Sequence, residues 1–281
     1  MRTKRRTVFD IISVILFVMI SLIMLIPIYK VLVDSFDLKT AYGMRLLPQQ
    51  FGLDGYISVF TNPTLFQPFL ISCVTTIAGT FAGLAISTLG AYVLIQWKMP
   101  GRKLLANFLL FTMIFNGGMI PTYLVINKLH MINTMWAIVL PPAISTYNMI
   151  VMRTSFQAIP DSLVESAYLD GANDITIFSK IVLPLSKAII ATMTLYYAVY
   201  HWNSYFPSVL YLNDQKKYPV QVVMRDIVIQ GDPSEITGSV NIIATNYKYA
   251  VIIISIVPIL LVYPLLQKYF TKGVMVGAVK G

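Results

Sequence analysis

The feature that most constrains the fold is a series of six long apolar runs whose centres contain no Asp, Glu, Lys or Arg. A helix satisfies its own backbone hydrogen bonds in lipid and needs about 20 mostly apolar residues to cross it. A charge at the centre of such a helix would cost about 2.5 to 3.5 kcal/mol. We therefore expect an all-α, polytopic membrane protein with six transmembrane helices. The expected spans are Ile11–Val33, Phe69–Ile95, Leu104–Ile126, Met135–Phe156, Ala188–Leu212 and Ala250–Tyr269.

Composition argues against a soluble protein. Of the 281 residues, 57% are apolar and 12% are charged, whereas roughly 25% of residues are charged in an average soluble domain. The formal net charge is +9, but the basic residues lie in short clusters between the uncharged runs and not on one face of a soluble fold. We expect contact with membrane lipid and no nucleic-acid partner.

The sequence offers little for catalysis. Cys73 is the single cysteine, and His130 and His201 are the only histidines, so a metal site would be poor in ligands. Phosphate-binding loops of the GxxxxGK[ST] and GxGxxG types are also missing. We expect no enzymatic activity and no cofactor bound by this chain, so any ATP used must be hydrolysed by another subunit.

Basic residues predict the topology. With the amino terminus inside, 13 Lys and Arg residues fall in cytoplasmic segments and 8 on the other side. This excess predicts a multi-pass protein of the inner (cytoplasmic) cell membrane with both termini in the cytoplasm. The amino-terminal run lacks a small-x-small cleavage site, which favours a retained first span over a cleaved signal. It follows the basic cluster Arg2, Lys4, Arg5 and Arg6.

Several runs contain residues that favour close packing or bending. Gly79 and Gly83 form a small-xxx-small pattern, continued by Ser87 and Ala91, which allows another helix to approach. Bends at membrane depth are tolerated beside protein or a water-filled cavity, although ordinary kinks in a static bundle are the alternative. The bend-prone residues are Asn116, Gly117, Gly118, Pro121, Pro141, Pro142, Pro207, Pro258 and Pro264.

Two outer segments, Asp34–Pro68 and Asn213–Tyr249, are the longest connections, at about 35 residues each, which is short for an independent domain. They contain turn-rich pieces at Asn213-Asp214 and Gly231-Asp232-Pro233. They suit either a docking surface for an external partner or plain solvated loops.

The most informative stretch is the cytoplasmic loop at residues 158–187. Ser162 and Glu165 have the S-x-x-E spacing of a helix capping box, and Gly171 suits the left-handed residue that ends a helix. Asp174 is expected to cap a second helical segment, and Pro184 to bend the chain toward the next span. The pattern predicts a helix, a glycine turn and a second helix beneath the membrane.

The charge of this loop favours a protein partner over a lipid surface. The loop contains more acidic residues than the two lysines can balance, which is unfavourable beside an anionic leaflet. Four acidic residues are concerned. They are Asp161, Glu165, Asp170 and Asp174 against Lys180 and Lys187.

The same loop carries a family resemblance. Residues 165–172 read ESAYLDGA and residues 181–184 read IVLP, which closely resembles the EAA loop of ABC importer permeases, EAAxxDGA followed by IxLP at the same spacing. Ser166 stands where the family usually has alanine, a small-for-small change. Residues 116–129, 201–207 and 269–281 are similar to the smaller permease subunit of maltose-type carbohydrate importers.

The resemblance implies a type I ABC importer permease fold. It implies a heterodimeric channel with a second permease subunit, two ATPase subunits that use ATP and Mg, and an extracytoplasmic sugar-binding protein. The corresponding organisation is an amino-terminal tail, first span and outer loop at 1–68, a permease core at 69–270 with the EAA loop at 158–187, and a cytoplasmic tail at 271–281. In the family, the EAA helix docks on the ATPase, and the carboxy-terminal tail of the permease can contact the ATPase pair.

We expect two sets of functional residues. Coupling to the ATPase is assigned to Glu165, Ala167, Asp170 and Gly171, with Glu165 and Gly171 acting by shaping the helix. Polar and aromatic groups at span depth are candidates for a sugar pathway, although packing between helices is the alternative reading for each of them. These are Asn116, Asn148, Tyr197, His201, Trp202 and Asn203.

Two other kinds of transporter are alternatives to a carbohydrate ABC permease. An ABC permease for a non-sugar solute would share the EAA loop, and only the extended resemblance favours carbohydrate. A self-sufficient secondary transporter is disfavoured, because such proteins often bury charges for ion coupling and the span centres have none. The sequence does not specify the sugar, and the resemblance favours oligosaccharides released from polysaccharides.

Overall fold

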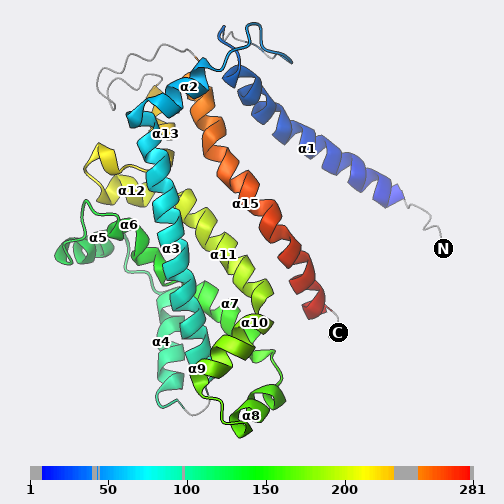
Figure 1. The fold of residues 1–281 in the computed structure, drawn as a ribbon, viewed down its shortest axis with the longest axis vertical. Helices are drawn as coiled ribbons and strands as arrows, with labels where there is room; N and C mark the ends of the chain where they lie inside the picture. The colour runs from blue at the N-terminus through cyan, green and yellow to red at the C-terminus, as the bar shows by residue number, and fades with distance from the viewer. Residues whose placement is uncertain (1–7, 40–42, 44, 97–98, 231–245, 279–281) are drawn as a thin grey trace. The chain divides into compact units, whose positions relative to one another are not determined.

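The computed structural model describes residues 8–39, 43, 45–96, 99–230 and 246–278. In this part of the chain the elements are helices, and the isolated bridge between Asp37 and Phe51 is the β pairing present. The amino-terminal basic cluster, the turn at 231–233 and the last three residues of the expected tail lie outside the described residues. The all-α prediction is confirmed (Figure 1).

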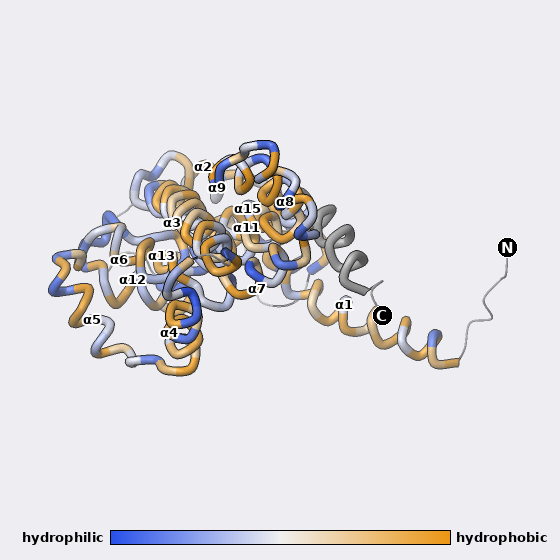
Figure 2. Tube along the Cα trace, turned by 90° about the horizontal axis from the view of Figure 1, so that it is seen from below, coloured by the Kyte–Doolittle hydropathy of each residue, from blue (hydrophilic) through white to orange (hydrophobic). Residues whose placement is uncertain are grey.

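Among the described residues, three helices are long and apolar enough to cross a membrane: α1 (Val8–Ser35), α3 (Pro63–Ile95) and the part of α15 (Tyr247–Ala278) up to Pro264. Counting each of two bent helix pairs as one span raises the number to five, by length and composition alone. Figure 2 shows apolar residues along nearly the whole of α1. Within the described residues, the six expected runs therefore do not appear as six continuous helices.

The expected third span is broken. It consists of α4 (Arg102–Ile114) and α5 (Met119–Lys128), whose axes differ by 120°. The Asn116 side chain accepts a hydrogen bond from the Gly118 backbone N–H at 2.9 Å, and Gly118 has a φ of +89°. The bend therefore lies at the Asn-Gly-Gly sequence, because glycine adopts this conformation without a steric penalty.

The expected fourth and fifth spans are also interrupted, in both cases near proline. Pro141 and Pro142 stop the fourth, because proline cannot continue the helical hydrogen-bond ladder. The fifth stops at Trp202 and resumes with Pro207 in its first turn. The resulting elements are α6 (Trp136–Val139), η1 (Pro141–Ala143), α7 (Thr146–Gln157), α11 (Lys187–Trp202) and α12 (Phe206–Tyr211).

The chain divides into two compact units, one of Met1–Phe66 with Met224–Ile256 and one of Gln67–Val223 with Val257–Gly281. In the first unit, the Ser35 hydroxyl hydrogen-bonds with the Tyr56 hydroxyl at 2.8 Å, which joins α1 to α2 (Asp54–Thr61). Asn246 donates to the Ser35 carbonyl at 2.8 Å. These bonds tie the end of α1 to the start of α15 inside this unit.

The second unit is organised around α3. Its small residues admit α11, as predicted: the Gly83 Cα faces the ring of Tyr197, and the Ser87 hydroxyl hydrogen-bonds with the Tyr197 hydroxyl at 2.6 Å. A buried apolar cluster then joins α3, α7, α11 and the helical segment 174–182. Its largest fully buried members are Leu94, Met152, Phe156, Ile177 and Met193.

At the other end of α3, short elements follow α12. The backbone N–H of Val220 donates to the buried Ser72 hydroxyl at 2.8 Å, which fixes the start of the following helix against α3. Gln67 donates to the Lys216 carbonyl at 3.0 Å. These elements are η3 (Gln215–Lys217) and α13 (Val220–Gln230).

Candidate functional site

The candidate site is the helical hairpin that lies beside the carboxyl end of α3 (Figure 1). Its first helix, α8 (Asp161–Leu169), follows Pro160, whose extended ψ of 129° places it before the helix. The predicted capping box is wrong. Because α8 begins at Asp161, Ser162 is already its second residue, and the helix start has no side-chain cap.

Gly171 ends α8 as predicted. It has a φ of +81°, its N–H donates to the Tyr168 carbonyl at 3.0 Å, and the Ala172 N–H donates to the Ala167 carbonyl at 2.9 Å. These two bonds form a Schellman motif, which satisfies carbonyls left free by the last helical turn. The turn therefore fixes the direction in which the chain leaves α8.

The second helix of the hairpin starts one residue earlier than predicted. Asn173, and not Asp174, is the cap of α9 (Asp174–Ile177), and its side-chain oxygen accepts from the Thr176 N–H at 2.8 Å. Helical winding continues through a π-type turn, η2 (Phe178–Val182), and α10 (Leu183–Leu185). The chain then bends by 81° into α11, directly after Pro184, which confirms the predicted bend.

Asp174 has a different role because Asn173 caps the helix. Its carboxylate accepts a hydrogen bond from the Tyr168 hydroxyl, and its backbone carbonyl accepts one from the Tyr92 hydroxyl at 3.1 Å. The Tyr92 ring also packs against Phe178, with centroids 4.9 Å apart. The hydrogen bond to Asp174, with smaller contributions from burial and from nearby charge, raises the pKa of Tyr168 to about 12. The phenol, which is protonated at neutral pH even at its ordinary pKa of 10.0, thus stays a donor further into the alkaline range.

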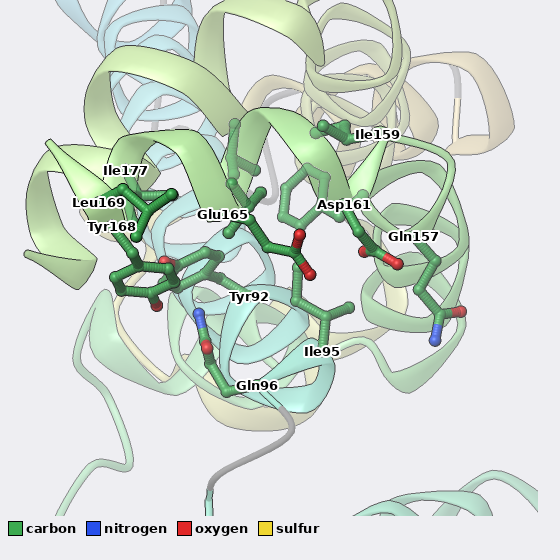
Figure 3. Close-up of a pocket in the computed structure, with 13 residues that line it drawn as sticks. Tyr92, Ile95, Gln96, Gln157, Ile159, Asp161, Glu165, Tyr168, Leu169 and Ile177 are labelled. Atoms are coloured by element: carbon green, nitrogen blue, oxygen red, sulfur yellow. The ribbon is translucent and has the colours of Figure 1, made fainter. Parts of the chain in front are cut away.

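A pocket of about 850 Å³ lies between α8 and the ends of α3 and α7. Figure 3 shows the carboxylates of Asp161 and Glu165 and the amides of Gln96 and Gln157 along this pocket. Apolar side chains from the buried cluster, such as Phe156, form its inner wall. The pocket thus has an apolar interior and a polar edge on the side of α8.

The predicted coupling residues occupy distinct places on α8. Glu165 and Asp170 are exposed, and Asp170 is the last residue before the glycine turn. Ala167 is half-buried and packs against the apolar cluster of α3, α7 and α11. The small residue therefore contacts the apolar cluster, while Glu165 lies at the polar edge of the pocket and Asp170 at the exposed end of the helix.

The hairpin also exposes apolar side chains. Leu169 is 89% exposed and Ile175 is 77% exposed, and Leu163 and Leu185 are exposed as well. Exposed apolar residues beside carboxylates are typical of a surface that contacts another protein.

The predicted pathway residues are not gathered at one surface. Asn148, Tyr197, His201 and Trp202 are buried, whereas Asn116 and Asn203 are exposed. Their partners include Phe69, whose ring meets Trp202 edge-on at 5.8 Å, and the Val199 carbonyl, which accepts from Asn203 at 2.9 Å. The buried four have a packing role in this structure, and a role in a sugar pathway stays a prediction.

Sequence reasoning missed Tyr92, Tyr168 and Asn173 as parts of this site. Asn173 is a favoured cap residue next to the one chosen, so the sequence contained a signal for it. Tyr92 is 82 residues from Asp174, and the sequence contained no local signal for that contact. Among the described residues, no group of three or more His, Cys, Asp or Glu side chains is placed to hold a metal ion.

Comparisons with known proteins give a consistent result. A family model described as binding-protein-dependent transport system inner membrane component matches residues 2–276. The polygalacturonan/rhamnogalacturonan transport system permease protein YtcP of Bacillus subtilis (strain 168) is 42% identical over 285 residues, covering 99% of this chain and 100% of the relative. Protein LplC of the same organism is 40% identical, with 99% and 97% covered.

One solved structure is similar over nearly the whole chain. It belongs to a bacterial ABC transporter involved in the import of the acidic polysaccharide alginate, and it superimposes with a TM-score of 0.84 at 29% sequence identity. The match covers 96% of this chain and 99% of the other.

Proposed function

The chain belongs to the family of binding-protein-dependent transport system inner membrane components, and from this premise we propose that it forms half of the pathway of an ATP-driven carbohydrate importer. The family is a transport component and not an enzyme. The second half is a second permease subunit, two ATPase subunits bind ATP and Mg, and an extracytoplasmic binding protein delivers the sugar.

The observation that carries the proposal is the exposed, glycine-terminated helix α8 on a buried apolar cluster. A motor subunit that moves α8 would move the residues packed against it, because close-packed interiors transmit displacement. Because the capping box is not formed, Glu165 does not shape the helix start as expected, and we assign it a charged contact together with Asp170. Ala167 allows close packing, and Gly171 sets the direction of the helix. These four residues are our candidates for coupling to the ATPase.

For the topology we propose six crossings with both termini in the cytoplasm. α1, α3 and α15 cross as single helices, and the interrupted runs 104–126, 135–156 and 188–212 supply the other three. The excess of Lys and Arg in the cytoplasmic segments, 13 against 8, supports this orientation. A cysteine introduced at exposed Ser162 should then react with a membrane-impermeant reagent only in inside-out vesicles.

For the cargo we propose an acidic oligosaccharide released from a polysaccharide. Two similar proteins belong to transporters of such polysaccharides, one for polygalacturonan or rhamnogalacturonan and the other for alginate. Asn116, Asn203 and, in a conformation that opens the helix packing, Asn148, Tyr197, His201 and Trp202 are the proposed sugar contacts of this subunit. His201→Ala tests the last set, since normal uptake affinity and rate would remove His201 from it.

The test is uptake by proteoliposomes that hold this chain, the second permease and the two ATPases, supplied with the binding protein. We expect ATP-dependent uptake of oligogalacturonate and none by the chain alone. Efficient uptake of neutral maltooligosaccharides in place of oligogalacturonate would reject the acidic class, and uptake by the chain without ATPase would reject the importer.

A further inference from the structure

The helix α8 is weakly held by its own packing. None of its residues is buried, and Val164 and Ala167 are the half-buried apolar side chains that it contributes to the cluster beneath it. A nine-residue helix without a buried face is not fixed by apolar contacts alone. Other interactions must therefore set its orientation.

One such interaction spans the glycine turn. Tyr168, in the last turn of α8, donates its hydroxyl to the carboxylate of Asp174, the first residue of α9. The Asp174 carboxylate is available for this bond because Asn173 caps α9. The bond joins the two helices directly, in addition to the backbone bonds of the turn at Gly171.

A second interaction joins the same residue to α3. The Tyr92 hydroxyl donates to the Asp174 carbonyl at 3.1 Å, and the Tyr92 ring packs on Phe178. Tyr92 is buried at the cytoplasmic end of α3, next to fully buried Ala91. Asp174 is thus held by one tyrosine from α8 and by another from α3.

We propose that Tyr168, Asp174 and Tyr92 form a latch that fixes α8 on α3, and that they are positioning residues through which movement of α8 reaches the membrane-spanning helix. This inference rests on the proposed function of α8 in coupling. The latch predicts that removing one hydroxyl loosens transmission, while contacts between α8 and the ATPase persist.

The experiment compares Tyr168→Phe with wild type in the complete importer complex. Hydrogen exchange is measured for the amides of residues 161–172, and ATPase activity is measured with and without binding protein loaded with oligogalacturonate. We expect faster exchange in α8 and a ratio of stimulated to unstimulated ATPase lowered about two- to tenfold, as expected for the loss of one hydrogen bond. Tyr92→Phe should act in the same direction.

Conservative and matched variants distinguish the latch from general damage. Asp174→Asn keeps an oxygen that can accept from Tyr168 and should retain most of the stimulation, whereas Asp174→Ala should not. Tyr196→Phe removes a hydroxyl from an exposed tyrosine on α11 and should leave both measurements unchanged. Wild-type exchange in Tyr168→Phe, or faster exchange with an unchanged ATPase ratio, would overturn the latch. A wild-type complex without stimulated ATPase would instead contradict the proposed function.

Discussion

The imidazole ring of His201 on α11 lies against the backbone of Gly79 on α3, in the space that a Cβ atom at position 79 would occupy. One helical turn later in α3 and one turn earlier in α11, Gly83 faces Tyr197 in the same way. The small residues of α3 therefore leave space into which two large rings of α11 pack. This packing joins α11, which follows the helical hairpin of α8 and α9, to α3.

The variant Gly79→Ala should destabilise the protein by about 1–3 kcal/mol, because the rigid imidazole cannot move aside without shifting α11. Gly90→Ala on the same helix is the matched control. There the added methyl would meet the flexible end of Met149, which can change rotamer. Thermal unfolding of the solubilised proteins should show a clear loss for position 79 and little change for position 90. Equal stability of the two variants would contradict the claim that the His201 ring is held rigidly against position 79.

The sequence predicts a close helix contact at the small residues of α3, but it does not predict which residues of another helix make that contact. The spacing of Gly79, Gly83 and Ser87 indicates a face that another helix approaches closely, since small residues four apart share one side of a helix. Which ring fills each position depends on the register between α3 and α11, and that register is set by residues distant in the chain. The burial of His201 and Tyr197 is the result that the sequence left open.

The variant Gly171→Val should weaken the coupling between the permease and the ATPase subunits. A β-branched residue at a φ of +81° is strained, by about 1–3 kcal/mol, so the chain would leave α8 in another direction. We expect substrate-stimulated ATPase and uptake to fall together, with normal amounts of assembled complex in the membrane. Gly171→Asn should be milder, because asparagine tolerates the left-handed conformation. Unchanged stimulation and uptake in Gly171→Val would reject the role of the turn.

In the helical hairpin of α8 and α9, features that depend on the local sequence could be predicted, whereas contacts between distant residues could not. Gly171 was predictable because its conformation is a property of the backbone at one position. The choice between Asn173 and Asp174 as cap is a difference of one residue between two favoured types, which propensity does not resolve. Pro141 and Pro142 indicate a bend in the expected fourth span, but mean hydropathy is insensitive to the loss of a backbone donor, so the run is still expected as one span.

Asp37 should make the loop that follows α1 sensitive to acid. Its buried carboxylate accepts backbone N–H bonds from Lys39, Gln49 and Gln50 at 3.0–3.1 Å. Burial alone would raise the pKa of Asp37, but these donors and the charge of Arg45 outweigh it and lower the pKa below the ordinary 3.8. The ionised form is therefore the better bound one in the folded loop. Its stabilisation is present above pH 3.8 and is lost as the pH falls through the folded pKa.

The substitution Asp37→Asn tests this interpretation at neutral pH. Replacing one accepting oxygen by an NH₂ group leaves a backbone donor unpaired, which costs about 1–3 kcal/mol. Amide exchange at Gln49 and Gln50 should therefore be faster in the variant. In wild type the same amides should lose protection only in acid, and the variant should not show that acid step. A wild-type loop with equal protection well below its folded pKa would contradict the role of the carboxylate.

Asn133 should fix the connection between α5 and α6 through both its backbone and its side chain. It has a φ of +60°, its N–H donates to the Tyr211 carbonyl at 2.7 Å, and its side-chain oxygen accepts from the N–H groups of Asn213 and Asp214 at 3.2 and 3.1 Å. Lys217 also donates to its carbonyl at 2.7 Å. One residue thus joins the segment before α6 to the segment after α12.

Two substitutions at Asn133 separate these contributions. Asn133→Gly keeps the left-handed backbone at no steric cost and removes the side-chain acceptor, so its loss of stability measures the two hydrogen bonds, about 1–3 kcal/mol. Asn133→Ala removes the same acceptor and adds the strain of a Cβ in this conformation, about 1–2 kcal/mol more. Thermal unfolding should therefore rank wild type above Asn133→Gly and Asn133→Gly above Asn133→Ala. If the alanine variant were more stable than the glycine variant, a Cβ atom at this positive φ would not destabilise the native fold.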